Sequence, residues 1–454
     1  MRHILWFIVH YAFFLAIPNF GASISLFLFL LIEIVTVFLK KNRFSLIHFY
    51  FLGLLISVLA NIQLIYDFNF GDGVAAYPYA IPEFFPIAAL VFAIGNQAIC
   101  IGYQSIMTWK IPKVDFSVKL SEKNLKRVFY IGLIFSFKNY WIFFELPGSF
   151  QTIIEVIPII CIFILGKYAG KFNIKTLYNL AIILTVSVGF NAFLFSYLRM
   201  EIILPILVFL LSYFIGSNSL KSFFSLKFVP VIVLIVTFLS FFSLFGDQRS
   251  QLSVGFDRIS QFFVGASNEA LFDIDQEEKL SPFERSSNIA QVSSIIGLTY
   301  DNGYYNGLAS APLAAALVPR VFWPEKPVIA LGVWFALEID AASETEDWYN
   351  NSINMTIPGN LFLDFGWPGL IIGCFFIGVF IKLLWDSTNF YGSKFNILGT
   401  FLGVYLLFTG FLGIGADLQI LITYLAIYIV LLILSLILKR SNENTVYRSN
   451  VERK

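Results

Sequence analysis

Charged residues are scarce in this sequence of 454 residues, and their scarcity excludes most soluble folds. Charged side chains make up 13% of the chain and hydrophobic residues 58%, whereas soluble domains average about 25% charged residues. This composition excludes a soluble globular enzyme and a disordered chain. The net charge of +1 gives no electrostatic reason to expect a nucleic-acid partner. A polytopic membrane protein is the class that remains.

Cysteine and histidine are rare as well, with three residues of each. The cysteines lie inside apolar runs without metal-type spacing, so we expect small core residues. The histidines all fall in the first fifty residues, and we expect them at the membrane interface or in the core. Because no metal cluster and no Gly-rich phosphate loop is present, no metal or cofactor is predicted. The six residues are Cys100, Cys161, Cys374, His3, His10 and His48.

Apolar runs long enough to cross the membrane, which takes about 20 residues, occur in twelve places. The N-terminal run lacks a small-residue cleavage site, so we expect a retained first span. The run at 201–216 is short and is either a tilted partner of 176–197 or a re-entrant piece. The sequence thus predicts an all-α polytopic membrane protein of twelve transmembrane helices. They lie near residues 4–20, 22–39, 44–66, 83–103, 128–146, 149–166, 176–197, 201–216, 228–245, 362–385, 396–414 and 418–439.

The positive charges predict the orientation of these spans. Of the 30 Lys and Arg residues, 22 lie at the N-terminus and in the segments that flank or follow the even-numbered spans. Since Lys and Arg concentrate in cytoplasmic loops, we expect both termini to be cytoplasmic.

One long segment, residues 246–357, has no apolar run of spanning length, and by parity it is external. It carries fifteen acidic and six basic side chains. Ile289, Val292, Ile295 and Ile296 share one face of a short amphipathic helix, so we expect a folded cap that contains short helices. The predicted organisation is nine spans in 1–245, the external cap loop in 246–357, three spans in 358–439 and a cytoplasmic tail in 440–454.

Several arginines lie where the predicted external face meets the hydrocarbon. Arg199 sits at the turn between two spans, and Arg249 follows the ninth span. A guanidinium at that depth is expensive unless it is paired or binds an anion. Local pairs with Glu201 and Asp247 are the structural alternatives. Arg258 and Arg285 lie further into the loop, where either a structural or a substrate-binding role is open.

The densest cationic cluster is the turn around Arg320 and Lys326, which three prolines in 319–327 stiffen. Arg grips phosphate in a bidentate manner, and Lys acts as a point charge. Trp323 suits either the lipid headgroup level or a sugar face. A rigid cationic turn beside the membrane suits a lipid-linked phosphate or pyrophosphate. A structural turn with surface charges is the alternative.

Three stretches share the pattern of a known family. The first is Pro-Arg-x-x-Trp-Pro-x-Lys-Pro at 319–327, preceded by Gly-Leu-Thr-Tyr at 297–300. The second is the arginine-turned hairpin at 197–205, and the third is Gly-Asn-Leu-Phe-Leu-Asp-Phe-Gly-Trp-Pro-Gly at 359–369. With its span count and its large late loop, the chain resembles the Wzy-type oligosaccharide repeat-unit polymerases, which include the O-antigen polymerases. Related proteins would have Glu at position 360, where this chain has Asn360, and Asp364 is a nearby substitute.

The resemblance implies a metal-independent glycosyltransferase in the bacterial plasma (inner) membrane, without a cofactor. Such enzymes join undecaprenyl-pyrophosphate-linked oligosaccharide repeats into O-antigen or capsular polysaccharide on the outer face. Implied partners are the lipid-linked oligosaccharide, a chain-length regulator and a flippase of the same pathway. The catalytic candidates are Arg199, Arg249 and Arg320 for the leaving pyrophosphate, with Glu284 or Asp364 as the proton acceptor. The substrate-binding candidates are Lys326, Trp323, Tyr300, Arg258 and Arg285.

Three alternatives remain. One is a non-catalytic scaffold of an envelope complex, which the sequence does not exclude but which leaves the rigid cationic turns unexplained. An O-antigen ligase would use the same donor. The resemblance to such ligases would imply a histidine in the external loop, and segment 246–357 has none, which weighs against this alternative. A flippase for lipid-linked oligosaccharides would line a central path with charge. Only four ionisable side chains are expected inside the spans, namely Glu33, Lys138, Glu145 and Glu155.

Overall fold

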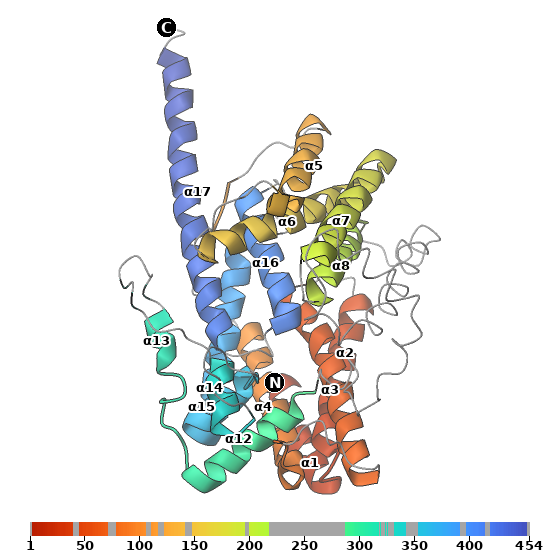
Figure 1. The fold of residues 1–454 in the computed structure, drawn as a ribbon, viewed down its shortest axis with the longest axis vertical. Coiled ribbons are helices and arrows are strands. Elements are labelled where there is room, and N and C mark those ends of the chain that lie inside the picture. The colour runs from red at the N-terminus through yellow and green to blue at the C-terminus, as the bar shows by residue number, and fades with distance from the viewer. Residues whose placement is uncertain are drawn as a thin grey trace. The chain divides into compact units, whose positions relative to one another are not determined.

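The computed structural model is helical wherever it describes regular structure (Figure 1). It describes residues 2–39, 45–70, 79–105, 110–116, 122–140, 148–195, 199–217, 287–316, 318, 323, 325, 331–341, 353–390, 396–413 and 418–451.

The helices belong to two compact units. The first unit comprises Met1–Ser117 and Glu277–Lys454, and the second comprises Val118–Gln276. In the first unit lie α1 (Arg2–Ala16), α2 (Gly21–Leu39), α3 (Leu46–Phe70), η1 (Pro82–Phe84), α4 (Phe85–Gln104), α12 (Ile289–Asn302), α13 (Pro312–Ala316), α14 (Leu331–Glu338), α15 (Ile357–Ser387), α16 (Ile397–Gly413) and α17 (Gln419–Val451). The second unit holds α5 (Glu122–Ser136), η2 (Lys138–Tyr140), α6 (Gly148–Phe172), α7 (Lys175–Phe195) and α8 (Arg199–Ser217).

Five of the described helices are long and apolar enough to cross a membrane. These are Leu46–Asn69, Pro82–Gln104, Lys175–Phe195, Ile357–Ser387 and Gln419–Ile437. Eleven of the twelve predicted spans overlap a described helix, and the twelfth, at 228–245, lies outside the described residues. The all-helical class is therefore confirmed for the described residues, and five helices are candidate membrane spans. The count of twelve spans stays a prediction.

Helix α5 shows why a predicted span and a described helix can differ. The span was expected at 128–146, but the helix runs over Glu122–Ser136. Its first turns carry Lys123, Lys126 and Arg127. Fifteen residues rise about 22 Å in an α-helix, which is less than the hydrocarbon thickness.

The first unit is built around α4, whose side chains are buried almost throughout. Its most extensive partner is α15, and glycines on both helices bring the two backbones together. A Cβ at Gly102 would overlap the carbonyl of Phe375, and a Cβ at Gly378 would overlap the carbonyl of Ile99. Small residues at such crossings are how helices pack closely in a membrane, where no hydrophobic force drives them together.

Helix α12 is the longest of the described helices in the segment 246–357, which the sequence predicts to be external. It packs against α4, η1 and α15, and the four apolar residues predicted to share its inner face are all buried. Asn61 of α3 caps its N-terminus, because Oδ1 accepts hydrogen bonds from the Ser287 hydroxyl (2.9 Å) and from the N–H groups of Asn288 (2.9 Å) and Ile289 (3.2 Å). This confirms short helices in the segment, and the described contacts fasten α12 to the membrane helices.

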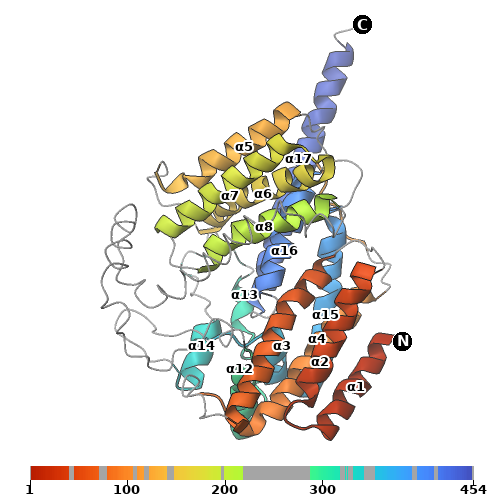
Figure 2. The ribbon, with the colours of Figure 1, turned by 90° about the vertical axis from the view of Figure 1, so that its right-hand side faces the viewer.

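The second unit is a bundle in which α6 contacts α5, α7 and α8 (Figure 2). The α6–α8 contact is the closest, because Gly166 and Gly170 on α6 meet Ser212 and Tyr213 on α8. The spacing of those two glycines is the Gly-x-x-x-Gly pattern that favours close crossing of membrane helices.

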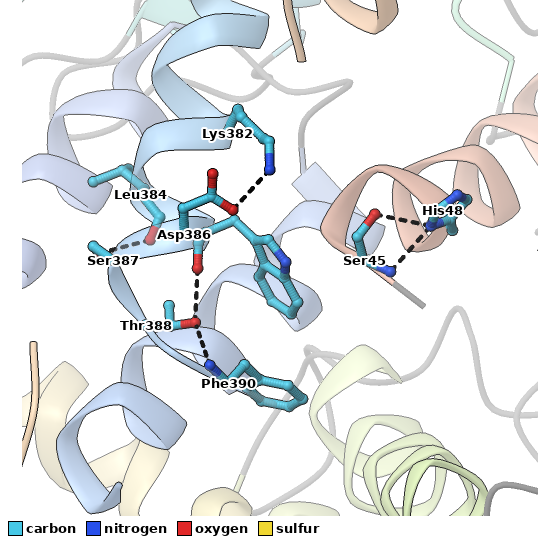
Figure 3. A network of polar contacts seen from close by, with 9 residues as sticks. Ser45, His48, Lys382, Leu384, Asp386, Ser387, Thr388 and Phe390 are labelled. Carbon is cyan, nitrogen blue, oxygen red and sulfur yellow. Dashed lines mark hydrogen bonds and ion pairs between the residues drawn. The ribbon is translucent and has the colours of Figure 1, made fainter. Parts of the chain in front are cut away.

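Polar side chains terminate the long helices of the first unit (Figure 3). Before α3, the hydroxyl of Ser45 lies 2.8 Å from Nδ1 of His48, which also accepts from the Ser45 N–H. After α15, the Thr388 hydroxyl donates to the carbonyl of Trp385 at 2.8 Å and accepts from the N–H of Phe390. These bonds satisfy backbone groups that a helix end leaves unpaired.

We predict that Asn61→Ala lowers the free energy of unfolding by about 2 kcal/mol, because two buried donors and one half-buried donor lose the Asn61 oxygen as acceptor. Denaturation of the purified protein in lipid bicelles measures this change. Gln63→Ala, an exposed side chain on the same helix, is the matched control and should leave the stability unchanged. Equal stability of both variants would contradict the capping role of Asn61.

Candidate functional site

The stretch 359–369 forms the first part of α15, and its residues produce a kink. Gly366 has φ +62° and ψ −151°, a conformation that interrupts the helix and that side-chain-bearing residues rarely adopt. Pro368 follows and suits the first turn of the continuing helix. At the other end Thr356 caps the helix, since its hydroxyl accepts from the N–H of Gly359 at 3.1 Å. Gly359 allows Ile295 of α12 to come close to this end of α15.

Asn360 and Asp364 lie one turn apart in this first part of α15, and both side chains are fully buried. Oδ1 of Asp364 accepts from the N–H groups of Gly307 (3.1 Å) and Ala309 (3.0 Å). Oδ2 accepts from the N–H of Ser310 (3.1 Å) and lies 2.5 Å from its hydroxyl. The same hydroxyl lies 2.7 Å from Oδ1 of Asn360.

These contacts define a structure that we name the Asp364 clamp: Asn360, Asp364 and the loop of residues 303–310 that they hold. The backbone of the loop also pairs with α15, because the N–H of Tyr305 donates to the carbonyl of Leu363 (3.0 Å) and that of Asn306 to the carbonyl of Asp364 (2.8 Å). Gly307, at φ +90°, lets the loop turn toward the carboxylate.

Helix α14 is joined to the Asp364 clamp through Tyr305. The phenol donates a hydrogen bond to Glu338 at 2.6 Å, and its ring meets Trp334 edge-on with centroids 5.8 Å apart. Burial and the neighbouring Glu338 raise the pKa of Tyr305, so the phenol stays protonated and remains a donor at neutral pH. The clamp therefore ties together α12, α14 and α15.

Around the clamp, large side chains are exposed. Tyr300 at the end of α12 is 80% exposed and contacts Phe84 at a centroid distance of 6.1 Å. Tyr304, Leu308 and Phe365 are exposed as well. Exposed tyrosines next to a rigid loop can stack on sugar rings or sit at the headgroup level of a membrane.

The chemistry open to Asp364 follows from its bonds. A carboxylate offers about four lone-pair positions, and four donors already occupy those of Asp364. These contacts give Asp364 the role of holding the loop. Its assignment as the proton acceptor stays a prediction, and a free lone pair would require release of one of these donors.

The other predicted site residues are placed as follows. Trp323 is exposed, as Tyr300 is. Arg199 is the first residue of α8, in the second unit. The remaining predictions lie outside the described residues: Arg249, Arg258, Arg285, Arg320, Lys326 and Glu284. Among the residues that the structure describes, no three His, Cys, Asp or Glu side chains gather into a metal site.

Sequence reasoning singled out Asp364 but missed its partner Ser310, whose residue type is too common to stand out. It also missed Asn61, although a signal was available: an amide side chain inside an apolar span needs a hydrogen-bonding partner.

Comparison with protein-family models, with curated proteins and with solved structures finds no match to this chain.

We predict that Asp364→Ala lowers the free energy of unfolding by about 3–5 kcal/mol, because it leaves several buried donors without an acceptor. The loss should be largest for residues 303–310, which would become accessible to protease. Asp301→Ala, in which an exposed carboxylate is removed from the end of α12, is the control. A stable Asp364→Ala protein with an uncleaved loop would contradict the clamp.

Proposed function

We propose that this chain is a membrane glycosyltransferase that joins undecaprenyl-pyrophosphate-linked oligosaccharide repeats into a polysaccharide. The reaction would take place on the outer face of the bacterial plasma membrane. The proposal rests on the resemblance to Wzy-type polymerases in the stretches 319–327, 197–205 and 359–369.

The observation that supports it most is the Asp364 clamp. The stretches 297–300 and 359–369 are about sixty residues apart in the sequence, and they lie on α12 and α15, which pack against each other. The clamp fastens the loop that follows α12 to α15 by hydrogen bonds, with the exposed Tyr304 in that loop and the exposed Tyr300 just before it. A rigid loop with exposed aromatic rings suits the binding of a sugar chain, for which side chains must be held in place before the substrate arrives.

The proposed chemistry is a substitution at an anomeric carbon. A hydroxyl of one repeat attacks the anomeric carbon of a second, lipid-linked glycan, and a new glycosidic C–O bond forms. The bond to the pyrophosphate breaks, and its electron pair leaves with the lipid pyrophosphate. The hydroxyl proton passes to a carboxylate. Glu284 is the candidate for this role, because the Asp364 carboxylate already accepts hydrogen bonds from the loop.

Fixed cations are the main requirement of this reaction, because negative charge grows on the leaving group. Preorganised positive groups stabilise such charge most effectively where water is excluded. Arg199, Arg249 and Arg320 are proposed for this task, with Lys326 in support and Arg258 and Arg285 as further contacts to the substrate. In this proposal, Tyr300 and Trp323 stack on sugar rings.

We predict that Arg199→Ala, Arg249→Ala and Arg320→Ala each reduce polymer formation about 100-fold or more, as loss of a transition-state donor does. The measurement uses purified protein with lipid-linked repeats and resolves product length on gels. Lys279→Ala removes a cation from the same predicted loop and is the matched control. Normal polymer from all three arginine variants would refute the assignment of these cations.

A deletion strain separates the polymerase from the flippase. A strain without the polymerase should still display glycans of a single repeat, because the repeats reach the outer face but are not joined. A strain without the flippase should display none. Absence of all surface glycan would overturn the proposed reaction.

We predict that Tyr300→Ala raises KM for the lipid-linked oligosaccharide up to about tenfold, because an aromatic stacking contact is lost. Tyr300→Phe keeps the ring and should retain the normal KM. Tyr11→Ala, which removes an exposed tyrosine from α1, controls for membrane anchoring. An unchanged KM for Tyr300→Ala would show that this ring does not contact the sugar.

A further inference from the structure

The first part of α15, residues 357–365, folds back against the part that follows Gly366. In a continuous helix, residues eight or more positions apart are separated by about 12 Å or more along the axis. Here a Cβ at Gly369 would lie 2.9 Å from the carbonyl oxygen of Leu361, and a Cβ at Gly373 would lie 2.8 Å from Cδ1 of the same leucine. The two parts of α15 therefore form the arms of a helical hairpin, with its turn at Gly366.

The hairpin packs against α4, which is one of the candidate membrane spans. A Cβ at Gly95 of α4 would lie 2.6 Å from Cβ of Pro358 and 2.8 Å from Cδ1 of Leu370, one residue on each arm of the hairpin. Because Gly102 further along α4 approaches Phe375, the second arm runs in the same direction as α4. Both arms therefore lie beside the interior of a candidate span.

This packing gives the depth of the hairpin turn. Gly95 lies ten residues beyond Phe85, where α4 begins, or about 15 Å inside the end that the sequence predicts to be external. Gly366 lies four residues before Leu370, which brings the turn about 6 Å closer to that end. The turn is therefore about 9 Å inside the predicted external end of α4, and the rest of the first arm lies deeper.

The loop of the Asp364 clamp is fastened to this turn. The N–H groups of Tyr305 and Asn306 donate to backbone carbonyls of the first arm. A Cβ at Gly307 would lie 3.2 Å from the ring of Phe365, the residue before the turn. The loop therefore shares the depth of the turn beside α4.

The backbone N–H groups of the loop have their acceptors inside the protein. All six N–H groups of residues 305–310 are bonded: three to the Asp364 carboxylate, two to carbonyls of α15, and that of Leu308 to the carbonyl of Tyr305. Non-helical backbone at membrane depth must find its partners within the protein, because hydrocarbon offers none. The Asp364 carboxylate thus supplies what a loop at this depth requires.

The exposed side chains where this loop meets α15 are mainly apolar. Leu308, next to Gly307, is 72% exposed, and Phe365 is 48% exposed. The exposed amide of Asn306 is bonded to the carbonyl of Tyr304 at 3.0 Å. An exposed apolar face on a candidate span is typical of a surface that meets lipid chains. Between the turn and residue 376, the exposed residues of α15 continue such a face: Pro368, Ile371, Ile372 and Phe376.

We propose that the loop at 303–310 lies within the membrane leaflet on the predicted external side, where Leu308 and Phe365 contact the acyl chains of lipids. Its depth beside α4, its internally bonded N–H groups and its exposed apolar side chains each support this placement. The loop belongs to the segment that the sequence predicts to be an external cap, so the proposal moves this part of the segment into the bilayer. It does not depend on the proposed glycosyl transfer.

The test is electron paramagnetic resonance of spin labels on the full-length protein in lipid nanodiscs. Leu308→Cys places a label on the loop, Ile372→Cys places one on the apolar face of α15, and Asp301→Cys places one at the end of α12. Because the native cysteines Cys100, Cys161 and Cys374 are buried, the unaltered protein measures any label that they take up. Collisions of each label with oxygen, which concentrates in hydrocarbon, are compared with collisions with a water-soluble nickel chelate.

We expect the ratio of oxygen to nickel collisions at position 308 to match that at position 372 and to exceed that at position 301. Asp301 is the aqueous control, because the neighbouring Tyr300 contacts Phe84 at the very end of α4. Phe365→Cys repeats the measurement at a second position, and thermal melting verifies that each labelled protein is folded. A ratio at position 308 as low as that at position 301 would place the loop in water and overturn the proposal. A label that neither reagent reaches would also overturn it, since a second copy or another protein would then cover the loop.

Discussion

The hydrogen bonds from the loop at 303–310 to the buried Asp364 carboxylate organise one end of the first unit. Backbone N–H groups away from water need acceptors, and Asp364 accepts from three of them in that loop, at Gly307, Ala309 and Ser310. The loop that the carboxylate holds follows the end of α12 and contacts α14 through the bond of Tyr305 to Glu338. Tyr304 lies within this loop, and the exposed Tyr300 lies in the last turn of α12 that precedes it.

The same need for internal partners recurs across the bundle. Asn61 caps α12 from within an apolar helix. Asn396 binds the carbonyls of Val114 and Thr388, and so fastens a non-helical stretch to the end of α15. Gln97 does the same for the start of α1, because its Nε2 donates to the carbonyl of His3. Amide side chains thus hydrogen-bond across helices and loops, whereas contacts between apolar surfaces are not directional. Helix α4 links these places, because it carries Gln97 and packs along the α15 helix that holds Asp364.

Many helices could be predicted, because the length of an apolar run indicates a span and the spacing of apolar residues indicates the buried face of a helix. Eleven predicted spans overlap described helices, and the predicted apolar face of α12 is buried. The boundaries of α5 were less predictable, since its charged first turns continue the helix outside the apolar run. Asp364 was found through its motif, but its four bonds depend on a loop more than fifty residues away, and no local pattern encodes such a contact. For the same reason the hydrogen bond from Gln97 to the carbonyl of His3, across 94 positions of sequence, could not be predicted from composition.

Hydrogen exchange of the backbone amides tests the central claim most directly, that Asp364 holds the loop at 303–310 in the native protein. In full-length protein in nanodiscs, the amides of Gly307, Ala309 and Ser310 should exchange slowly, and Asp364→Asn should bring their exchange close to that of an open peptide. Fast exchange of these amides in the unaltered protein would contradict the account.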